Sequence, residues 1–277
     1  MENYKRSLQL CILEIVKDID KVCKKNNIEY CLAYGSVLGS VRHNGFIPWD
    51  DDFDIMIKYD EYEKFINCCI NELDSNKYFI QNDNTESNFY LRFTKIRDIT
   101  TTYIEESNKN EKIQFGVYVD VFPIVGCPKN PVKREILKIC RACAMSVDRN
   151  IINNKFFYCI FKFLTKIIGK EKIRKWAYKR CISYSCDSCD ELISIFDGDG
   201  FEINVFNKKD VFPTRKEKFE DTKLPIPRNY DIYLKKLYGN YMKIPSEEEI
   251  KKNTHTPFYI NLKEGNRVNY EEEVNHK

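Results

Sequence analysis

Four aspartates occur within five positions of this chain: Asp50, Asp51, Asp52 and Asp54. Crowded carboxylates repel one another and raise one another's pKa unless a cation neutralises them. The cluster lies between Trp49 and a mainly apolar run that ends at Ile57, which is not typical of the alternative, a solvated acidic turn. From Asp52 onward charged and apolar residues alternate with a period of two, so Asp52 and Asp54 share one side of a predicted strand.

Hard oxygen ligands on one side of a strand suit Mg²⁺ or Mn²⁺. Such an ion usually keeps several waters and binds substrate phosphates through one or two carboxylates. A neighbouring strand could supply a third carboxylate, and the best candidate is Asp120, in the predicted strand 117–124 that Pro123 closes. Without such a role, a charge flanked by apolar residues and lacking a partner would be costly to bury.

The pair Gly35-Ser36 closes a predicted strand, 28–34, and opens a predicted helix. Backbone N–H groups at such a turn, the serine hydroxyl and the helix dipole favour phosphate oxygens. A lone Gly-Ser pair is a weak signal, but one that precedes a run of carboxylates from strand to strand is specific. The combination describes the nucleotidyltransferase superfold, with a phosphate-binding Gly-Ser, an Asp-x-Asp pair and a distant third acid.

The elements that must position these residues follow from the apolar pattern. Apolar residues at i, i+3 and i+4 predict a helix over 4–27 and another over 59–73, and further strands are predicted at 78–80, 89–96 and 100–105. Residues 131–195 are mainly helical in pattern, followed by a short β element at 202–212 and a helix at 230–237. We therefore expect an α+β fold, a mixed β-sheet core flanked by helices with a mainly helical C-terminal half.

Three segments are expected: a nucleotidyltransferase-like catalytic core at 1–130, a mainly helical region at 131–260 that packs on it, and a polar tail at 261–277 that frays. The 277 residues carry a net charge of +3, from 45 basic and 42 acidic side chains, which gives no basis for nucleic-acid binding. The sequence shows no spanning helix and no signal-peptide pattern. We expect a cytoplasmic protein.

Two weaker signals concern cysteines and the membrane. Cys140/Cys143 and Cys186/Cys189 have the spacing of zinc ligands, although thiols on a buried helix face need no metal. Residues 151–170 are aromatic and basic, which is typical of a core helix or, alternatively, of an interfacial helix that brings the protein to lipid-linked glycan at the inner membrane face.

Three blocks of the sequence resemble the LicD family, which includes bacterial phosphocholine transferases and shares its core with fukutin-like sugar-phosphate transferases. The first and most specific runs from Tyr34 to Ile55, the second from Tyr118 to Pro123, and the third comprises parts of 219–245. The resemblance spans about residues 28–255. Two departures, Val125 after the Phe-Pro pair and Asp221 after Phe219-Glu220, lie outside the presumed metal ligands.

The resemblance implies transfer of a phospho-linked group, phosphocholine or a polyol phosphate, from a CDP-activated donor to a hydroxyl of a cell-surface glycan precursor such as a teichoic acid or capsule, with release of CMP. Asp52 and Asp54 would hold Mg²⁺ or Mn²⁺ against the diphosphate, and one or two ions are possible. Asp120 would be a third ligand or the base for the acceptor hydroxyl, and Asp50 a further ligand or a support for the others.

The same resemblance indicates which residues would bind phosphate. Gly35 and Ser36 would seat the phosphates, and Arg42 would meet a phosphate oxygen or an aspartate. His43 could act in the same way or be structural, and Lys95 could meet the donor or face solvent. Two other functions remain open: a nucleotidyltransferase that moves a nucleoside monophosphate from a nucleoside triphosphate, and an inactive glycan-binding protein.

Overall fold

The computed structural model describes all residues except 1–2, 147–165, 199, 254–256, 263–269 and 274–277, and it confirms the α+β class. A seven-stranded mixed sheet forms the centre of the molecule, in the order β1-β2-β6-β4-β3, with β7 and β8 continuing from β6. The strands are β1 Tyr30–Leu32, β2 Asp54–Lys58, β3 Tyr78–Gln81, β4 Thr94–Asp98, β6 Val117–Cys127, β7 Glu191–Ser194 and β8 Val205–Asn207. Among these described strands only β2 and β6 pair in parallel.

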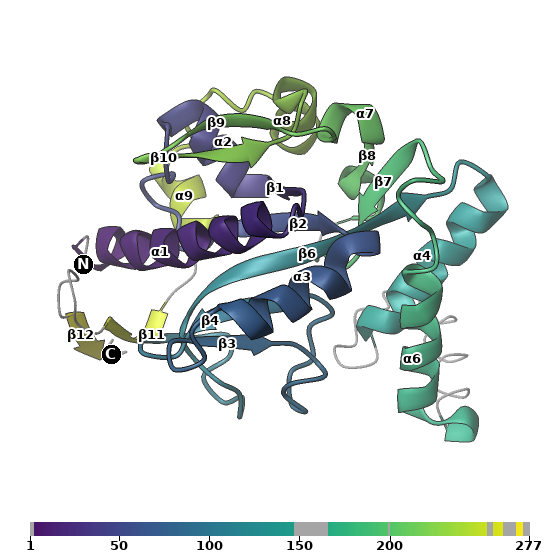
Figure 1. Ribbon diagram of the computed structural model, residues 1–277, viewed down its shortest axis with the longest axis horizontal. Helices are drawn as coiled ribbons and strands as arrows, with labels where there is room; N and C mark the ends of the chain where they lie inside the picture. The colour runs from purple at the N-terminus through teal and green to yellow at the C-terminus, as the bar shows by residue number, and fades with distance from the viewer. Residues whose placement is uncertain (1–2, 147–165, 199, 254–256, 263–269, 274–277) are drawn as a thin grey trace.

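Two long helices, α1 (Asn3–Lys25) and α3 (Tyr59–Glu72), pack side by side against the sheet (Figure 1). Both confirm predicted helices. The apolar stripe of α1 is fully buried in the main core, and the Tyr62 hydroxyl of α3 donates a hydrogen bond to the Val121 carbonyl at 2.8 Å. These helices hold β2 and β6 in a fixed position.

A second group of elements lies above the sheet in Figure 1. It comprises α2 (Tyr34–His43), η1 (Glu202–Asn204), α7 (Lys208–Val211), the hairpin of β9 (Arg215–Phe219) and β10 (Thr222–Ile226), and α8 (Tyr230–Tyr238). Phe219 of β9 contacts Phe46 and Phe53, with ring centroids 4.9 and 5.2 Å away. This C-terminal hairpin therefore shares the main core with the segment that carries the aspartates.

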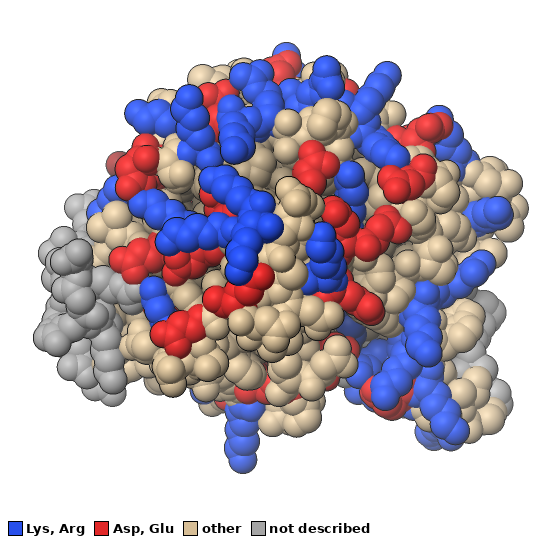
Figure 2. Space-filling model, in the orientation of Figure 1, with Lys and Arg blue, Asp and Glu red and all other residues tan. Residues whose placement is uncertain are grey.

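Most of the remaining described elements lie at the two ends of the molecule. At one end α4 (Pro131–Ser146) packs on α6 (Lys170–Cys181), whose basic side chains are visible at the lower right of Figure 2. At the other, β5 (Thr102–Glu105) and β11 (Pro257–Leu262) pair with each other, and β11 pairs with β12 (Tyr270–Glu273). The short helix α9 (Glu247–Asn253) lies between these ends, near β10 and α1 in Figure 1. The tail, which we expected to fray, thus contributes a strand at 270–273.

The predicted end of the strand that contains Asp120 was wrong, because Pro123 does not close it. β6 continues to Cys127. Pro123 lies between Val121, the last residue of β6 in register with β4, and Ile124, the first in register with β7. A proline is tolerated there because its missing N–H falls between two pairing partners.

The cysteines contribute to packing in the described part of the chain. Cys140 of α4 and Cys181 of α6 are buried in a second apolar cluster beneath β7. The Cys186 thiol donates to the Ile124 carbonyl at 3.2 Å. Residues 151–165 of the predicted interfacial helix lie outside the described residues, and among the helices that are described none has the length and apolar character to cross a bilayer.

Candidate active site

Two aspartates from neighbouring strands form the centre of the site. Asp54 opens β2, and its register partner on the parallel strand β6 is Asp120. Residues in register on adjacent strands project from the same face of a sheet. Both side chains are buried, with 9% and 8% of the residue surface exposed. The third acid that we predicted therefore lies beside the Asp-x-Asp pair.

The environment of these two carboxylates opposes their ionisation. Burial raises the pKa of Asp54 well above its usual value, and the charges of Asp52, Asp120 and Asp50 raise it further. Burial also raises the pKa of Asp120, while the ammonium of Lys95 opposes that shift. A cation held between these carboxylates would relieve their mutual repulsion.

Lys95 lies deeper than predicted. Its Nζ donates to both carboxylate oxygens of Asp120, at 2.6 and 2.9 Å, and lies 3.5 Å from the centroid of the Tyr118 ring. Because Asp120 and Lys95 are opposite each other on β6 and β4, this ion pair is set by strand register. Lys95 compensates one of the buried charges of the site.

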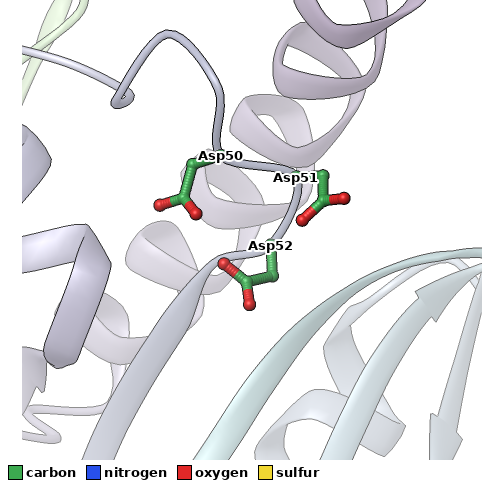
Figure 3. Close-up of side chains that lie close together, drawn as sticks. All are labelled: Asp50, Asp51 and Asp52. Atoms are coloured by element: carbon green, nitrogen blue, oxygen red, sulfur yellow. The ribbon is translucent and has the colours of Figure 1, made fainter. Parts of the chain in front are cut away.

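The loop before β2 adds three more carboxylates, Asp50, Asp51 and Asp52, with one oxygen of each within 4.8 Å of the others. Figure 3 shows Asp50 and Asp51 extending to opposite sides of the loop and Asp52 just before the strand. Asp51 is buried and accepts a hydrogen bond from the Tyr103 hydroxyl at 3.1 Å. Sequence reasoning gave Asp51 no role, and a buried partner on β5 could not be inferred from local pattern.

The Gly-Ser turn packs directly on these carboxylates. A Cβ at Gly35 would lie 2.9 Å from Asp50 Oδ2, so a larger residue there would displace that carboxylate. The Ser36 hydroxyl accepts a hydrogen bond from the Asp54 N–H at 2.9 Å, which ties α2 to β2. The preceding residue, Tyr34, has a φ of 45°, and its N–H donates to the Tyr233 hydroxyl at 3.1 Å. Strained backbone of this kind is characteristic of functional sites.

Arg42 and His43 form one unit at the end of α2. Arg42 Nε donates to His43 Nε2 at 2.9 Å, and its Nη1 donates to the carbonyls of Tyr241 at 2.8 Å and Lys243 at 3.3 Å. The guanidinium carbon lies 5.7 Å from the Trp49 ring centroid. Burial and the charge of Arg42 both lower the pKa of His43. His43 is thus a neutral acceptor that orients Arg42.

A cavity of about 610 Å³ opens over this arrangement. Among the predicted site residues it is lined by Gly35, Arg42, Asp50, Asp52 and Asp54. The side chains of Ser36, His43, Lys95 and Asp120 stand behind that lining, in contact with it through the hydrogen bonds and charges described above. The structure thus brings together the predicted carboxylates and the Gly-Ser turn at one cavity.

The opposite side of the cavity comes from the C-terminal half of the chain. This C-terminal wall consists of Tyr238, Asn240, Tyr241, Lys243, Pro245 and Glu249. In the sequence, residues 237–245 stand out only as part of the third block that resembles the LicD family. That block is the signal by which the C-terminal wall could be predicted.

Comparison with known proteins agrees with this geometry. Residues 27–138 match the model of the LicD/FKTN/FKRP nucleotidyltransferase domain. The chain is 24% identical over 262 residues to the lipopolysaccharide cholinephosphotransferase LicD of Haemophilus influenzae (strain Rd), covering 89% of this chain and 94% of that protein. An uncharacterized protein of Rickettsia prowazekii is 44% identical over 52 residues, 19% of this chain and 20% of that one. The chain is thus similar to a LicD protein over most of its length, and residues 27–138 match the nucleotidyltransferase domain of the LicD/FKTN/FKRP family.

Proposed function

We propose that this protein transfers a phospho-linked group, phosphocholine or a polyol phosphate, from a CDP-activated donor to a hydroxyl of a cell-surface glycan precursor and releases CMP. The observation that carries the proposal is the register of Asp54 against Asp120 beneath the cavity that Gly35 and Arg42 line. The relative in H. influenzae is a lipopolysaccharide cholinephosphotransferase, which favours phosphocholine as the transferred group.

The side chains at the site are suitable ligands for a divalent cation. Asp50, Asp52, Asp54 and Asp120 offer only hard oxygen ligands, and the mutual repulsion that raises the pKa of Asp54 would be relieved by a positive charge. These four residues would hold Mg²⁺ or Mn²⁺. The ion would neutralise charge on the diphosphate oxygens when bound.

The other residues position the donor and handle the proton. The Gly35 turn and Arg42 would bind phosphate oxygens in the cavity, since backbone N–H groups at a helix start and a guanidinium both suit phosphate. Asp120 would serve as a ligand or accept the proton of the attacking acceptor hydroxyl at a carboxylate oxygen. In the transfer the acceptor oxygen forms a bond to phosphorus, and the bond from phosphorus to the CMP oxygen breaks.

The test is nucleotide-induced thermal stabilisation of the full chain with Mg²⁺, across CDP-choline, CDP-glycerol, CDP-ribitol, CTP, ATP and UDP-sugars. A ligand at 100 times its Kd should add about 2.7 kcal/mol of stability. The expected result is a Mg²⁺-dependent shift with one CDP conjugate and formation of CMP when acceptor is added. The double variant Asp52→Asn/Asp54→Asn should lose both, whereas Asp221→Asn, at an exposed ion pair with Lys17, should keep them.

Two outcomes would replace this function. Stabilisation by CTP or ATP alone, with pyrophosphate as the product, would indicate a nucleotidyltransferase. If none of these ligands stabilises the protein, the glycan-binding function would replace the transferase.

A further inference from the structure

A second cavity, of about 250 Å³, lies between α3, the start of β4 and α6. Nothing in the catalytic arrangement described above uses it. Its walls combine aromatic rings, side-chain amides and a few charges, and they come from elements that the main cavity does not contact. It is therefore a separate candidate site.

Aromatic rings form one wall of this second cavity. Tyr59 and Tyr62 stack with centroids 5.9 Å apart and an interplanar angle of 12°, and Tyr178 of α6 lines the same cavity. Tyrosine offers an apolar face together with a polar hydroxyl. Such a wall suits a ligand that has both apolar C–H faces and hydroxyl groups.

Amides form the other wall. Asn67 projects from an exposed position on α3, and Asn82 and Asn84 come from the loop after β3. The Asn82 Oδ1 accepts the N–H groups of Asn84 at 3.0 Å and Thr85 at 3.2 Å, so the loop is built before any ligand arrives. An amide both donates and accepts hydrogen bonds, which matches the hydroxyls of a sugar.

The charges in the cavity disfavour a phosphate ligand. Arg92, whose side chain is 2% exposed, lies 3.6 Å from Asp83 and donates to the Ala144 carbonyl at 3.3 Å. A second acid, Glu63, also lines the cavity. With its one arginine engaged and two acids present, the cavity suits a neutral polyhydroxylated ligand more than an anion.

One phenylalanine links the cavity to the catalytic carboxylates. Phe93 lines the cavity and packs on Phe122 with a centroid distance of 4.4 Å, while the Lys95 ammonium lies 5.5 Å from the Phe93 centroid. Lys95 in turn pairs with Asp120. The second cavity is thus adjacent to the Asp120 side of the site, whereas the main cavity is on the Gly35 and Asp50 side.

We propose that this second cavity binds a neutral sugar ring of the acceptor glycan. The proposal rests on the proposed function for the acceptor role, but sugar binding itself can be measured without transfer. The bound ring would anchor the glycan beside Phe93, and another part of the same glycan would carry the acceptor hydroxyl to the carboxylates. The residues that hold the sugar would be Tyr59, Asn67 and Asn84.

The test is saturation-transfer NMR on the full chain with the methyl β-glycosides of glucose, galactose and N-acetylglucosamine. We expect transfer from at least one glycoside, and about ten-fold weaker binding in Asn67→Ala/Asn84→Ala, because two hydrogen bonds are lost. The variant Asn67→Trp, which fills the cavity from an exposed helix position, should abolish the signal. The matched control is Asn71→Ala, an exposed asparagine of α3 that does not line the cavity.

Stabilisation by CDP-choline, measured on the same variants, separates this proposal from the proposed function. It should be unchanged in Asn67→Ala/Asn84→Ala. Loss of that stabilisation would make the cavity a nucleotide site and overturn the proposal, as would equal glycoside signals in the variants and the natural chain, or no signal from any of the three glycosides. If glycosides bind here but no CDP conjugate stabilises the protein, the sugar site stands and its acceptor role is rejected.

Discussion

The two sides of the main cavity are built in different ways. Asp54 and Asp120 are held by paired strands in the middle of the sheet and are almost completely buried. In the C-terminal wall, by contrast, Tyr238 is 43% exposed, and the loop that follows α8 is attached by single contacts such as Arg42 to Tyr241 and the Tyr241 hydroxyl to Asp231.

This difference suggests separate roles for the two sides: the sheet holds the groups proposed for catalysis, and the C-terminal wall selects the donor. A sheet fixes its side chains to within small displacements because neighbouring strands share a hydrogen-bond ladder, which suits groups that must act on one phosphorus atom. A loop held by a few contacts can change its residues without disturbing the core. The proposed catalytic acids should therefore be intolerant of substitution, while the C-terminal wall should tune which donor binds.

Asp54→Asn is expected to have the largest effect. Transfer should fall roughly ten-thousand-fold, about 5.5 kcal/mol of barrier, because the site loses a carboxylate that would hold the cation against the diphosphate. The midpoint of thermal unfolding should not fall, since the amide removes one of several repelling buried charges. Initial rates of CMP release and a thermal melt measure the two quantities. A variant that kept most of its activity would remove Asp54 from the chemistry.

Phe219→Ala tests whether the C-terminal hairpin is part of the same rigid body as the acids. We expect a loss of about 3–5 kcal/mol of folding free energy, because Phe219 is fully buried against Phe46 and Phe53. Denaturant unfolding measures the loss. A single, less stable transition supports one common core, whereas a separate early transition would show that β9 and β10 unfold on their own.

Arg42→Ala should affect binding more than chemistry. The guanidinium holds the carbonyls of Tyr241 and Lys243, so its removal loosens the C-terminal wall and deletes a phosphate contact. We expect the donor KM to rise about ten-fold to a hundred-fold, with kcat changed less than about three-fold. Arg228→Ala, at an exposed arginine outside the cavity, is the control. A loss confined to kcat would place Arg42 with the catalytic group instead.

Glu202→Gln should have the smallest effect and leave transfer unchanged. Hydrogen bonds from Arg134 and then Lys138 lower the pKa of Glu202 from 4.5 to about 2. A lowered carboxyl pKa stabilises the fold above pH 4.5, and this contribution disappears as the pH falls toward 2. Because the side chain is 58% exposed, solvent screening limits the effect to under about 1 kcal/mol. Unfolding at pH 7 and pH 3 in both proteins measures it. A loss that stayed constant with pH would mean that packing, not charge, is involved.

Much of the fold was predictable because its signals are local. The apolar stripe of α1, the alternation in β2 and the Gly-Ser turn of α2 each depend on residues within a few positions of one another. Predicted strand boundaries were wrong where pairing with a strand distant in sequence sets the end of the strand. β4 begins at Thr94 rather than 89, and β6 continues through Pro123. A tail strand at 270–273 could not be foreseen, since its pairing with β11 leaves no mark in a polar sequence.

For the site, the sequence by itself determined which residue types are present: the run of aspartates, the Gly-Ser pair, and an isolated acid at position 120. Only the tertiary structure decided that Asp120 stands in register with Asp54, that Lys95 neutralises it, and that Tyr238 and its neighbours close the cavity from nearly two hundred residues away. The physical reason is that side-chain periodicity is encoded over a few residues, whereas strand register and the docking of α8 depend on contacts between distant segments.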